Sequence, residues 1–360
     1  SLSNIGVHNY EKLDFLKQTQ LKSILTGCCY DEDPNVRSSA VRALSLYVLF
    51  PSLREDLCFI ENTIESVLRI IKDQNLLSRT KSSFGLANIV DSLLSIKDTV
   101  TISENLQRQI IESCLQAAND NDRVKVNVVR TLGNSIVLLT NKQLENATWQ
   151  SLFKKSIEVF THQLASCSSA KVKWNICFAF SSIMKNLVIF EDDLRKKWQA
   201  SVFKQLTATM GSSPNFKVRT NACIALMTPK KRAHYGDFFI DIWKCLLFAL
   251  EQSNNLTDFN EYKHRDALQD QLCAAICHFL TLTSIDDVVS MKNHLFPLID
   301  GTKQNWNRVS NRLPPESQSE VLKACNTIEH LMISGSYKNS EQKNSLEILM
   351  SCFKPVEQFL

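Results

Sequence analysis

Cysteine and histidine are the side chains of this sequence best suited to metal or nucleophilic chemistry, and their densest group is Cys273, Cys277 and His278. The two thiols stand one helical turn apart and could share a metal ion, but no second pair of ligands follows at the spacing of a zinc site. Both cysteines also occupy apolar positions of the string LCAAICHFL. We therefore interpret the group as part of a hydrophobic core.

Short motifs that carry catalysis or cofactor binding are absent from the sequence. It contains no G-x-x-x-x-G-K-[ST], G-x-G-x-x-G, H-E-x-x-H or G-x-S-x-G string, so phosphate-binding loops, metalloprotease helices and hydrolase nucleophiles are not indicated. The sequence thus nominates no catalytic, cofactor-binding or metal-binding residue. We expect a protein that is not an enzyme and needs no cofactor.

Basic residues give only a weak indication of nucleic-acid binding. The run Lys230–Arg232 could be a short nuclear localisation signal or a solvated turn after Pro229, and the turn is the simpler interpretation because three adjacent basic residues are common. The net charge of +4 over 360 residues supplies little of the concentrated basic face that nucleic acids require. A nucleic-acid partner is therefore disfavoured.

An internal repeat organises the chain. Five similar segments recur at a spacing of about 42 to 48 residues, namely DPNVRSSAVRAL (33–44), LSRTKSSFGL (77–86), DRVKVNVVRTL (122–132), AKVKWNICFAF (170–180) and FKVRTNACIAL (216–226). Their origins are Val36, Ser78, Val124, Val172 and Val218. A small side chain stands seven residues after each origin, and a large apolar one stands eight after it. At about 100° per residue these positions share one face, so each segment is predicted to be a helix that buries that face.

A second amphipathic stretch precedes each segment, at 14–29, 59–73, 104–118, 148–165 and 192–210. The unit is therefore helix A, a short turn and helix B, and such a pair must stack on its neighbours to cover its apolar face. Weaker B helices are expected at 262–282 and 315–334, with a closing helix near 341–359. We predict an all-α, right-handed α-solenoid of about seven repeats that forms one domain over 1–360, with regular repeats at about 11–228 and degenerate or capping repeats at about 229–360.

The repeat pattern resembles that of HEAT solenoids. The strings VRSSAVRAL, KVKWN with MKN, NFKVR, PKKRAHYG and TDFNEYK, found between residues 33 and 263, are similar to the C-terminal HEAT-repeat region of the HEAT repeat-containing protein 6 family. Ser181 and Ser182 depart from the Gly-Asn pair present at Gly133 and Asn134. The resemblance implies a helix–turn–helix solenoid without enzymatic activity.

The sequence also leads to expectations about the cellular compartment of the protein and about whether the chain is a fragment. The twelve cysteines are scattered, which favours reduced thiols in the cytoplasm or nucleus. No apolar run approaches the ~20 residues of a membrane span, so we expect no membrane association. Because residue 1 is Ser and not Met, we expect the chain to be a fragment.

Two rows of polar residues recur along the B helices. The basic row follows each origin by one residue and comprises Arg37, Arg79, Lys125, Lys173 and Arg219. The amide row follows each origin by three and comprises Asn127, Asn175 and Asn221, with Ser39 and Lys81 in the earlier copies. Stacking of repeats turns each such position into a line across the helix-B wall.

The basic row has two interpretations. HEAT solenoids commonly use this position as a brace between repeats, which we expect at least for Arg37 and Arg79. Alternatively, Lys125, Lys173 and Arg219 contribute to partner binding.

For the amide row, similar armadillo solenoids pair such amides with the backbone of an extended peptide, since an amide both donates and accepts. If the row binds a partner, its amides should be partly exposed and free of partners within the chain. Trp174, beside Asn175, is a candidate anchor. The alternative is that the amides only join adjacent helices and the indole only fills space.

We accordingly expect a non-catalytic scaffold or adaptor that binds a peptide segment or partner protein through Asn127, Trp174, Asn175, Asn221 and the nearby cations Lys125, Lys173 and Arg219. Alternatives are a nuclear-transport-like receptor and a nucleic-acid-binding solenoid. Neither the partner nor the oligomeric state follows from the sequence.

Overall fold

The computed structural model describes residues 2–190, 197–254, 262–310, 315–335 and 337–354. Within these ranges the regular secondary structure is entirely helical, which confirms the all-α solenoid of helix pairs. The chain divides into two compact units, residues 1–183 (unit 1) and 184–360 (unit 2). Residues 192–196 of a predicted A helix, 257–261 of the string TDFNEYK and 355–359 of the predicted last helix lie outside the described residues.

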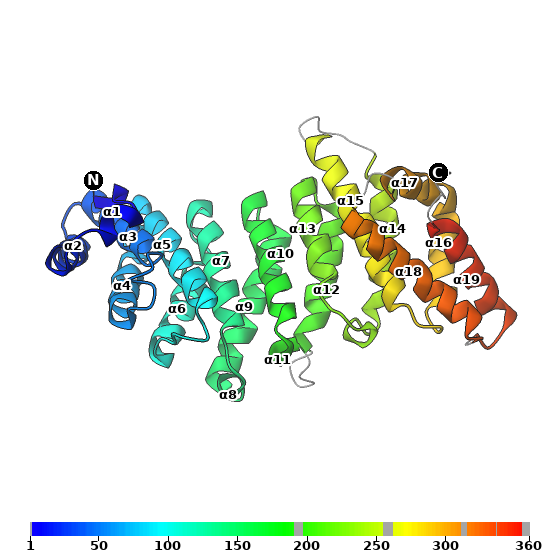
Figure 1. Ribbon diagram of the computed structural model, residues 1–360, viewed down its shortest axis with the longest axis horizontal. Helices are drawn as coiled ribbons and strands as arrows, with labels where there is room; N and C mark the ends of the chain where they lie inside the picture. The colour runs from blue at the N-terminus through cyan, green and yellow to red at the C-terminus, as the bar shows by residue number, and fades with distance from the viewer. Residues whose placement is uncertain (1, 191–196, 255–261, 311–314, 336, 355–360) are drawn as a thin grey trace. The chain divides into compact units, whose positions relative to one another are not determined.

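Unit 1 is a stack of A and B helices (Figure 1). The chain enters through η1 (Leu2–Asn4) and α1 (Val7–Glu11). The A helices are α2 (Phe15–Cys28), α4 (Leu57–Ile70), α6 (Glu104–Ala117) and α9 (Ala147–Ser166), with the short α8 (Asn141–Leu144) before α9. The B helices are α3 (Pro34–Tyr47), α5 (Leu76–Ser95), α7 (Asp122–Val137) and α10 (Ala170–Lys185), the last of which reaches the division between the units. Each predicted A–B pair is thus present.

Unit 2 continues the helix pairs with less regular lengths. It contains α11 (Leu187–Phe190), α12 (Lys197–Ser212), α13 (Phe216–Leu226), η2 (Arg232–His234), α14 (Phe238–Gln252), α15 (Tyr262–Leu282), α16 (Val288–Leu295), η4 (Phe296–Leu298), α17 (Ile299–Ser310), α18 (Pro315–Ile333) and α19 (Ser340–Phe353). Here α13 packs on α15 and α15 on α18, while α19 packs on α16 and α18.

Local signals set the helix starts. Asp33 accepts the backbone N–H of Asn35 at 2.8 Å, and Pro34 opens α3, as expected for an N-cap followed by a proline that has no N–H to satisfy. Asn121 caps α7 by accepting the N–H of Arg123 at 3.0 Å. The first turn of α7 then carries Asp122, where a negative charge favours the helix dipole.

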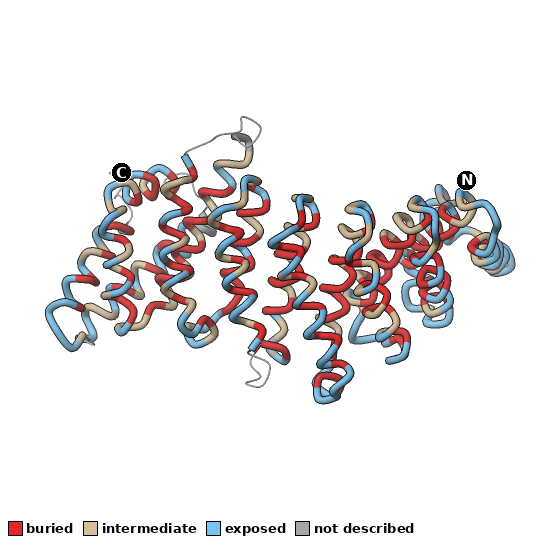
Figure 2. Tube along the Cα trace, turned by 180° about the vertical axis from the view of Figure 1, so that it is seen from behind, coloured by how far each residue is buried: buried red, intermediate tan, exposed pale blue. Residues whose placement is uncertain are grey.

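The repeat stripe forms the core of each unit. In unit 1, α3 packs on α5 and α5 on α7, and the apolar residues of the stripe, such as Val124 and Leu132, are fully buried. Figure 2 shows the result as buried segments that recur along most of the helices, whereas α2 is mostly exposed. Small residues stand where B helices come close: a Cβ added at Gly85 would run into Ser45 Oγ, and one at Gly133 would lie 2.5 Å from Ala179 Cβ. Close approach of B helices thus requires those side chains to be small.

Candidate functional site

The first two members of the basic row reach into the neighbouring repeat. Arg37 Nε lies 2.8 Å from Asp73 Oδ2, and Arg79 holds Asp120 by two bonds, Nε to Oδ2 at 2.6 Å and Nη2 to Oδ1 at 3.1 Å. Each guanidinium also donates to two carbonyl oxygens of the turn before its own helix. The hydrogen bond from Arg79 lowers the pKa of Asp120. These are the contacts that a brace between repeats would make.

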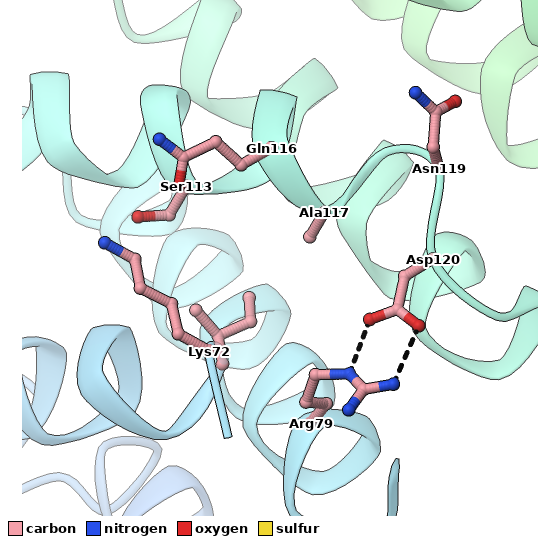
Figure 3. A pocket seen from close by; sticks show the side chains of 8 residues that line it. Lys72, Arg79, Ser113, Gln116, Ala117, Asn119 and Asp120 are labelled. Atoms are coloured by element: carbon pink, nitrogen blue, oxygen red, sulfur yellow. Dashed lines mark hydrogen bonds and ion pairs between the residues drawn. The ribbon is translucent and has the colours of Figure 1, made fainter. Parts of the chain in front are cut away.

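A pocket of about 390 Å³ opens beside the Arg79–Asp120 ion pair. Figure 3 shows the ion pair on one side of it and Lys72, Ser113 and Gln116 on the other. The carboxylate of Asp120 already neutralises the guanidinium of Arg79. The pocket therefore offers no unpaired group from the basic row to a ligand.

The pattern changes at the third repeat. Lys125 pairs with Asp122 of its own helix at 2.7 Å, and this hydrogen bond raises the lysine pKa. Cys167 stands six residues before Lys173, where the earlier repeats place an aspartate five or six residues before the basic residue, so no carboxylate is there to receive the Lys125 ammonium. Lys173 is half-buried and has no carboxylate partner within the described ranges.

Arg219 requires a correction. The sequence places it on a partner-binding surface, but it is only 6% exposed. Its Nε donates to the Met210 carbonyl at 2.8 Å, its guanidinium lies 5.1 Å from the Phe216 ring centre, and its Nη2 has no partner among the described residues. Burial lowers its pKa. A side chain enclosed in this way is not accessible to a partner.

The amide row is half-buried and its nitrogens are used within the chain. Asn175 Nδ2 donates to the Val126 carbonyl of α7 at 2.9 Å. Asn127 Nδ2 makes longer bonds, to Ser83 Oγ at 3.3 Å and to the Arg123 carbonyl at 3.4 Å. Asn221 Nδ2 donates to the Lys217 carbonyl of its own helix at 2.8 Å. The expectation of amides free of intramolecular partners is therefore corrected: the nitrogens satisfy helix carbonyls, and Asn175 joins α10 to α7.

The amide oxygens differ from the nitrogens. In the described part of the chain, no donor reaches Oδ1 of Asn127 or Asn175. Because each residue is only half-buried, these oxygens can accept a hydrogen bond from outside the chain. The row in unit 1 thus presents acceptors.

The structure adds an aromatic residue that the sequence analysis missed. Phe178 is 58% exposed, and half-buried Trp174 lies one helical turn before it on α10. The spacing i, i+4 puts both rings on one side of the helix. Phe178 stands six residues after its origin, where the other B helices have Arg42, Phe84, Arg130 and Ile224. A large aromatic residue at this repeat position, outside the buried stripe, was the signal by which the sequence could have identified Phe178.

The cysteine and histidine side chains of unit 2 that the sequence singled out are part of its packing. Cys273 and Cys277 are buried, and burial raises the pKa of Cys277 to about 12. His278 Nε2 lies 3.0 Å from Tyr235 Oη and 2.9 Å from the Pro229 carbonyl. No group of three or more potential metal ligands exists in the described ranges.

The basic run Lys230–Arg232 is partly tied down. Arg232 holds Asp287 by bonds of 2.8 and 2.7 Å and lies over the Phe239 ring. This residue is therefore part of the packing of unit 2 and not a solvated cation.

All twelve cysteines are free thiols, and eight are buried. No helix in the described ranges is long and apolar enough to cross a membrane.

Comparisons with known proteins define the resemblance. No family model matches the chain. An uncharacterised protein of Dictyostelium discoideum is 26% identical over 407 aligned positions, which cover 83% of this chain and 27% of the relative. The chain thus spans about a quarter of the length of the curated relative it matches.

Solved structures with similar helical arrangements include an engineered protein (TM-score 0.49, 14% identity, 98% of this chain and 92% of that one). Others are a computationally designed armadillo repeat protein for modular peptide recognition (0.45, 18%, 63% and 90%) and a chain from a study of the cadherin and β-catenin interaction (0.47, 14%, 92% and 63%). At TM-scores below 0.5 these likenesses say nothing about partner or mechanism. The helix pairs of the chain itself define its fold.

Proposed function

We propose that this chain is a non-catalytic scaffold that binds a peptide segment or partner protein across the B helices of unit 1. The observation that carries the proposal is Phe178, a large apolar ring that is 58% exposed on a B helix of a stacked array. Trp174 and Asn175 flank it on the same helix. Large aromatic side chains such as Trp are enriched at binding hot spots.

The proposed surface is smaller than the sequence analysis expected. It keeps Asn127, Trp174, Asn175 and Lys173. Lys125 stays a prediction without a clear role on this surface, because Asp122 already pairs with its ammonium group. It omits Arg219 because that side chain is buried. Asn221 belongs to unit 2, so it stays a prediction without a place on this surface.

Several wider expectations stay predictions. These are membership of the HEAT repeat-containing protein 6 family, a single array over 1–360 with degenerate repeats from about 229, and a cytoplasmic or nuclear location. The free and mostly buried thiols support a reducing compartment.

The test is peptide selection followed by variants. Peptides from a random display library that bind the chain are measured by fluorescence polarisation against the chain and against Phe178→Ser. We expect binding to weaken about tenfold or more while the melting temperature stays nearly unchanged, because an exposed ring contributes little to folding. Phe248→Ser is the matched control, since Phe248 is 49% exposed in unit 2 and its loss should leave binding intact. Equal losses in both variants, or none in either, would contradict the proposal.

Nucleic-acid binding is the second candidate, because unpaired cations lie on the same B helices. Binding of single-stranded RNA would weaken steeply with salt through counterion release, whereas a peptide held by aromatic and amide contacts would respond less. A salt titration of both probes separates the two candidates.

A further inference from the structure

Charge is distributed unevenly between the two kinds of helix in unit 1. The basic residues of its B helices are Arg37, Arg42, Arg79, Lys81, Arg123, Lys125, Arg130, Lys171, Lys173 and Lys185, and their acidic residues are Asp91 and Asp122. The A helices mix the two signs, with Glu61, Glu65, Glu104, Glu112 and Glu158 against Lys17, Lys22, Arg69, Arg108, Lys142, Lys154 and Lys155. The small net charge of the whole chain therefore hides a basic helix-B side.

Half of these cations are not neutralised within unit 1. Arg37, Arg79, Lys125 and Arg130 have the carboxylates of Asp73, Asp120, Asp122 and Asp91 as partners. By contrast, no carboxylate within the described ranges pairs with Arg42, Lys81, Arg123, Lys171 or Lys173. Arg42, Arg123 and Lys171 are exposed, and Lys81 and Lys173 are half-buried. These cations are available to an anionic partner.

Four of these cations share one strip with Phe178 and the amide groups. Relative to the repeat origins, Arg123 and Lys171 stand one residue before, Lys81 three after and Arg42 six after. On a helix these three positions fall within an arc of about 60°. Asn127 and Asn175 occupy the second position, and Phe178 occupies the third. We call this strip, over α3, α5, α7 and α10, the B-helix strip.

Apolar groups lie at both ends of the B-helix strip. At α3, a pocket of about 540 Å³ is lined by Val7, Leu46, Leu49, Phe50 and Pro51, with Leu49 47% exposed. At α10 lie Trp174 and Phe178. The cations Lys81 and Arg123 stand between them, on α5 and α7.

The spacing of the helices sets the length of a matching ligand. Adjacent packed helices lie about 8–10 Å apart, and an extended chain rises about 3.3 Å per residue. One step between B helices thus corresponds to about three residues. The three steps from α3 to α10 correspond to about nine residues of extended chain.

We infer that the partner of the B-helix strip is an extended acidic peptide with two apolar side chains about nine residues apart. This rests on the proposed function and names its ligand. The acidic side chains would meet Arg42, Lys81, Arg123 and Lys171, and the apolar ones would enter the α3 pocket and pack on Phe178.

The amide oxygens favour a peptide over a nucleic acid. Asn127 Nδ2 makes two hydrogen bonds within the chain and Asn175 Nδ2 makes one, so the two side chains present both oxygens as acceptors and a single N–H of Asn175 as a donor. Acceptors pair with the N–H groups of an extended peptide but oppose the phosphate oxygens of RNA or DNA. Phosphates would also leave the apolar pocket at α3 unfilled.

The experiment uses a fluorescein-labelled ten-residue probe with apolar ends, Leu-Asp-Glu-Ser-Asp-Glu-Gly-Asp-Glu-Phe. A second probe replaces every Asp and Glu by Asn and Gln, and a third is oligouridine RNA. Each is titrated against the chain, against Lys81→Glu/Arg123→Glu/Lys171→Glu, and against a control triple outside the B helices, Lys97→Glu/Lys142→Glu/Lys155→Glu. The two triples change the net charge equally and all six positions lack a carboxylate partner in the described structure, so both should keep the wild-type melting temperature.

We expect the acidic probe to bind the chain at least about tenfold more tightly than the neutral probe. The B-helix triple should lose about tenfold or more of that affinity, and the control triple about twofold or less. Equal binding of both peptides, with neither triple affected, would overturn the acidic ligand but leave the scaffold proposal standing. RNA bound more tightly than either peptide, and lost in the B-helix triple, would overturn the peptide inference in favour of a nucleic acid. No binding by the acidic, neutral or library peptides would overturn both proposals.

Discussion

Unit 1 and unit 2 use the same repeat position in opposite ways. In the first two repeats of unit 1, the cation after the helix-B origin is partly exposed and meets a carboxylate of the next repeat, as Arg79 meets Asp120. In unit 2, the corresponding Arg219 is buried and bonded only to a carbonyl, with a nitrogen left unpaired in the described structure. Unit 2 forms its paired arginine elsewhere, between Arg232 and Asp287. A repeated residue type thus has a structural role that depends on whether the adjacent turn supplies an acid.

The largest effect should come from the equivalent core position in each unit. Leu132 and Leu226 occupy the same repeat position and are both fully buried. Replacing either with Ala should cost about 2–5 kcal/mol, because a cavity replaces a packed side chain. If repeats stabilise mainly their neighbours, urea unfolding followed by hydrogen exchange will show each loss within the mutated unit. Identical, fully concerted losses over the whole chain would contradict this.

Lowering the pH should destabilise unit 2 more than unit 1. Burial, aided by Lys230, lowers the pKa of His278 to about 4, against about 6.5 for an unfolded histidine. The folded state therefore binds the proton less well, so this contribution to the stability of unit 2 is complete above pH ~6.5 and is lost as the pH falls toward 4. The loss should reach about 3 kcal/mol. Denaturant unfolding of the chain and of His278→Gln measures it, with His162→Gln, an exposed histidine of unit 1, as the control. A profile unchanged by His278→Gln would refute the assignment.

The two arginines give a direct test of the comparison. Arg79→Met should destabilise unit 1 by about 1–3 kcal/mol, since it breaks a bidentate ion pair and leaves Asp120 partly buried. Arg219→Met should stay within about 1 kcal/mol or stabilise unit 2, because it removes an incompletely paired buried charge. Comparable destabilisation in both variants would show that Arg219 is as well satisfied as Arg79.

The Arg79 contribution should also depend on pH. The pKa of Asp120 is lowered in the folded chain, so the ion pair stabilises above the unfolded value of about 4 and is lost as the pH falls through the folded pKa. The difference between wild type and Arg79→Met should therefore shrink below pH ~4.

The smallest effect is expected at Lys125. Its bond to Asp122 lies within one helix, and the Asp122 side chain is 46% exposed. Lys125→Met should change the stability by about 0.5 kcal/mol or less. Thermal unfolding of Lys125→Met and Arg79→Met, measured in parallel, tests this. A loss of stability in Lys125→Met as large as that in Arg79→Met would mean that Lys125 also braces two repeats.

The sequence by itself determined the helices and their stacking. Buried apolar residues such as Leu132 recur at the helical period, small residues such as Gly85 mark close approach, and Asp33 with Pro34 opens a helix, all of which are local or periodic properties of the chain. The inter-repeat contacts of Arg37 and Arg79 could also be anticipated, because the acid that receives each lies at the same place in the next repeat.

Only the tertiary structure decided which members of each row face solvent. Arg219 and Arg79 have the same place in the repeat, yet burial depends on the side chains that neighbouring helices bring to that position, and the repeat pattern does not specify those. The amide nitrogen of Asn175 is used by a carbonyl 49 residues away in sequence. Phe178 stays exposed for the complementary reason: its position points away from the buried stripe, and in the described structure no neighbouring helix covers it.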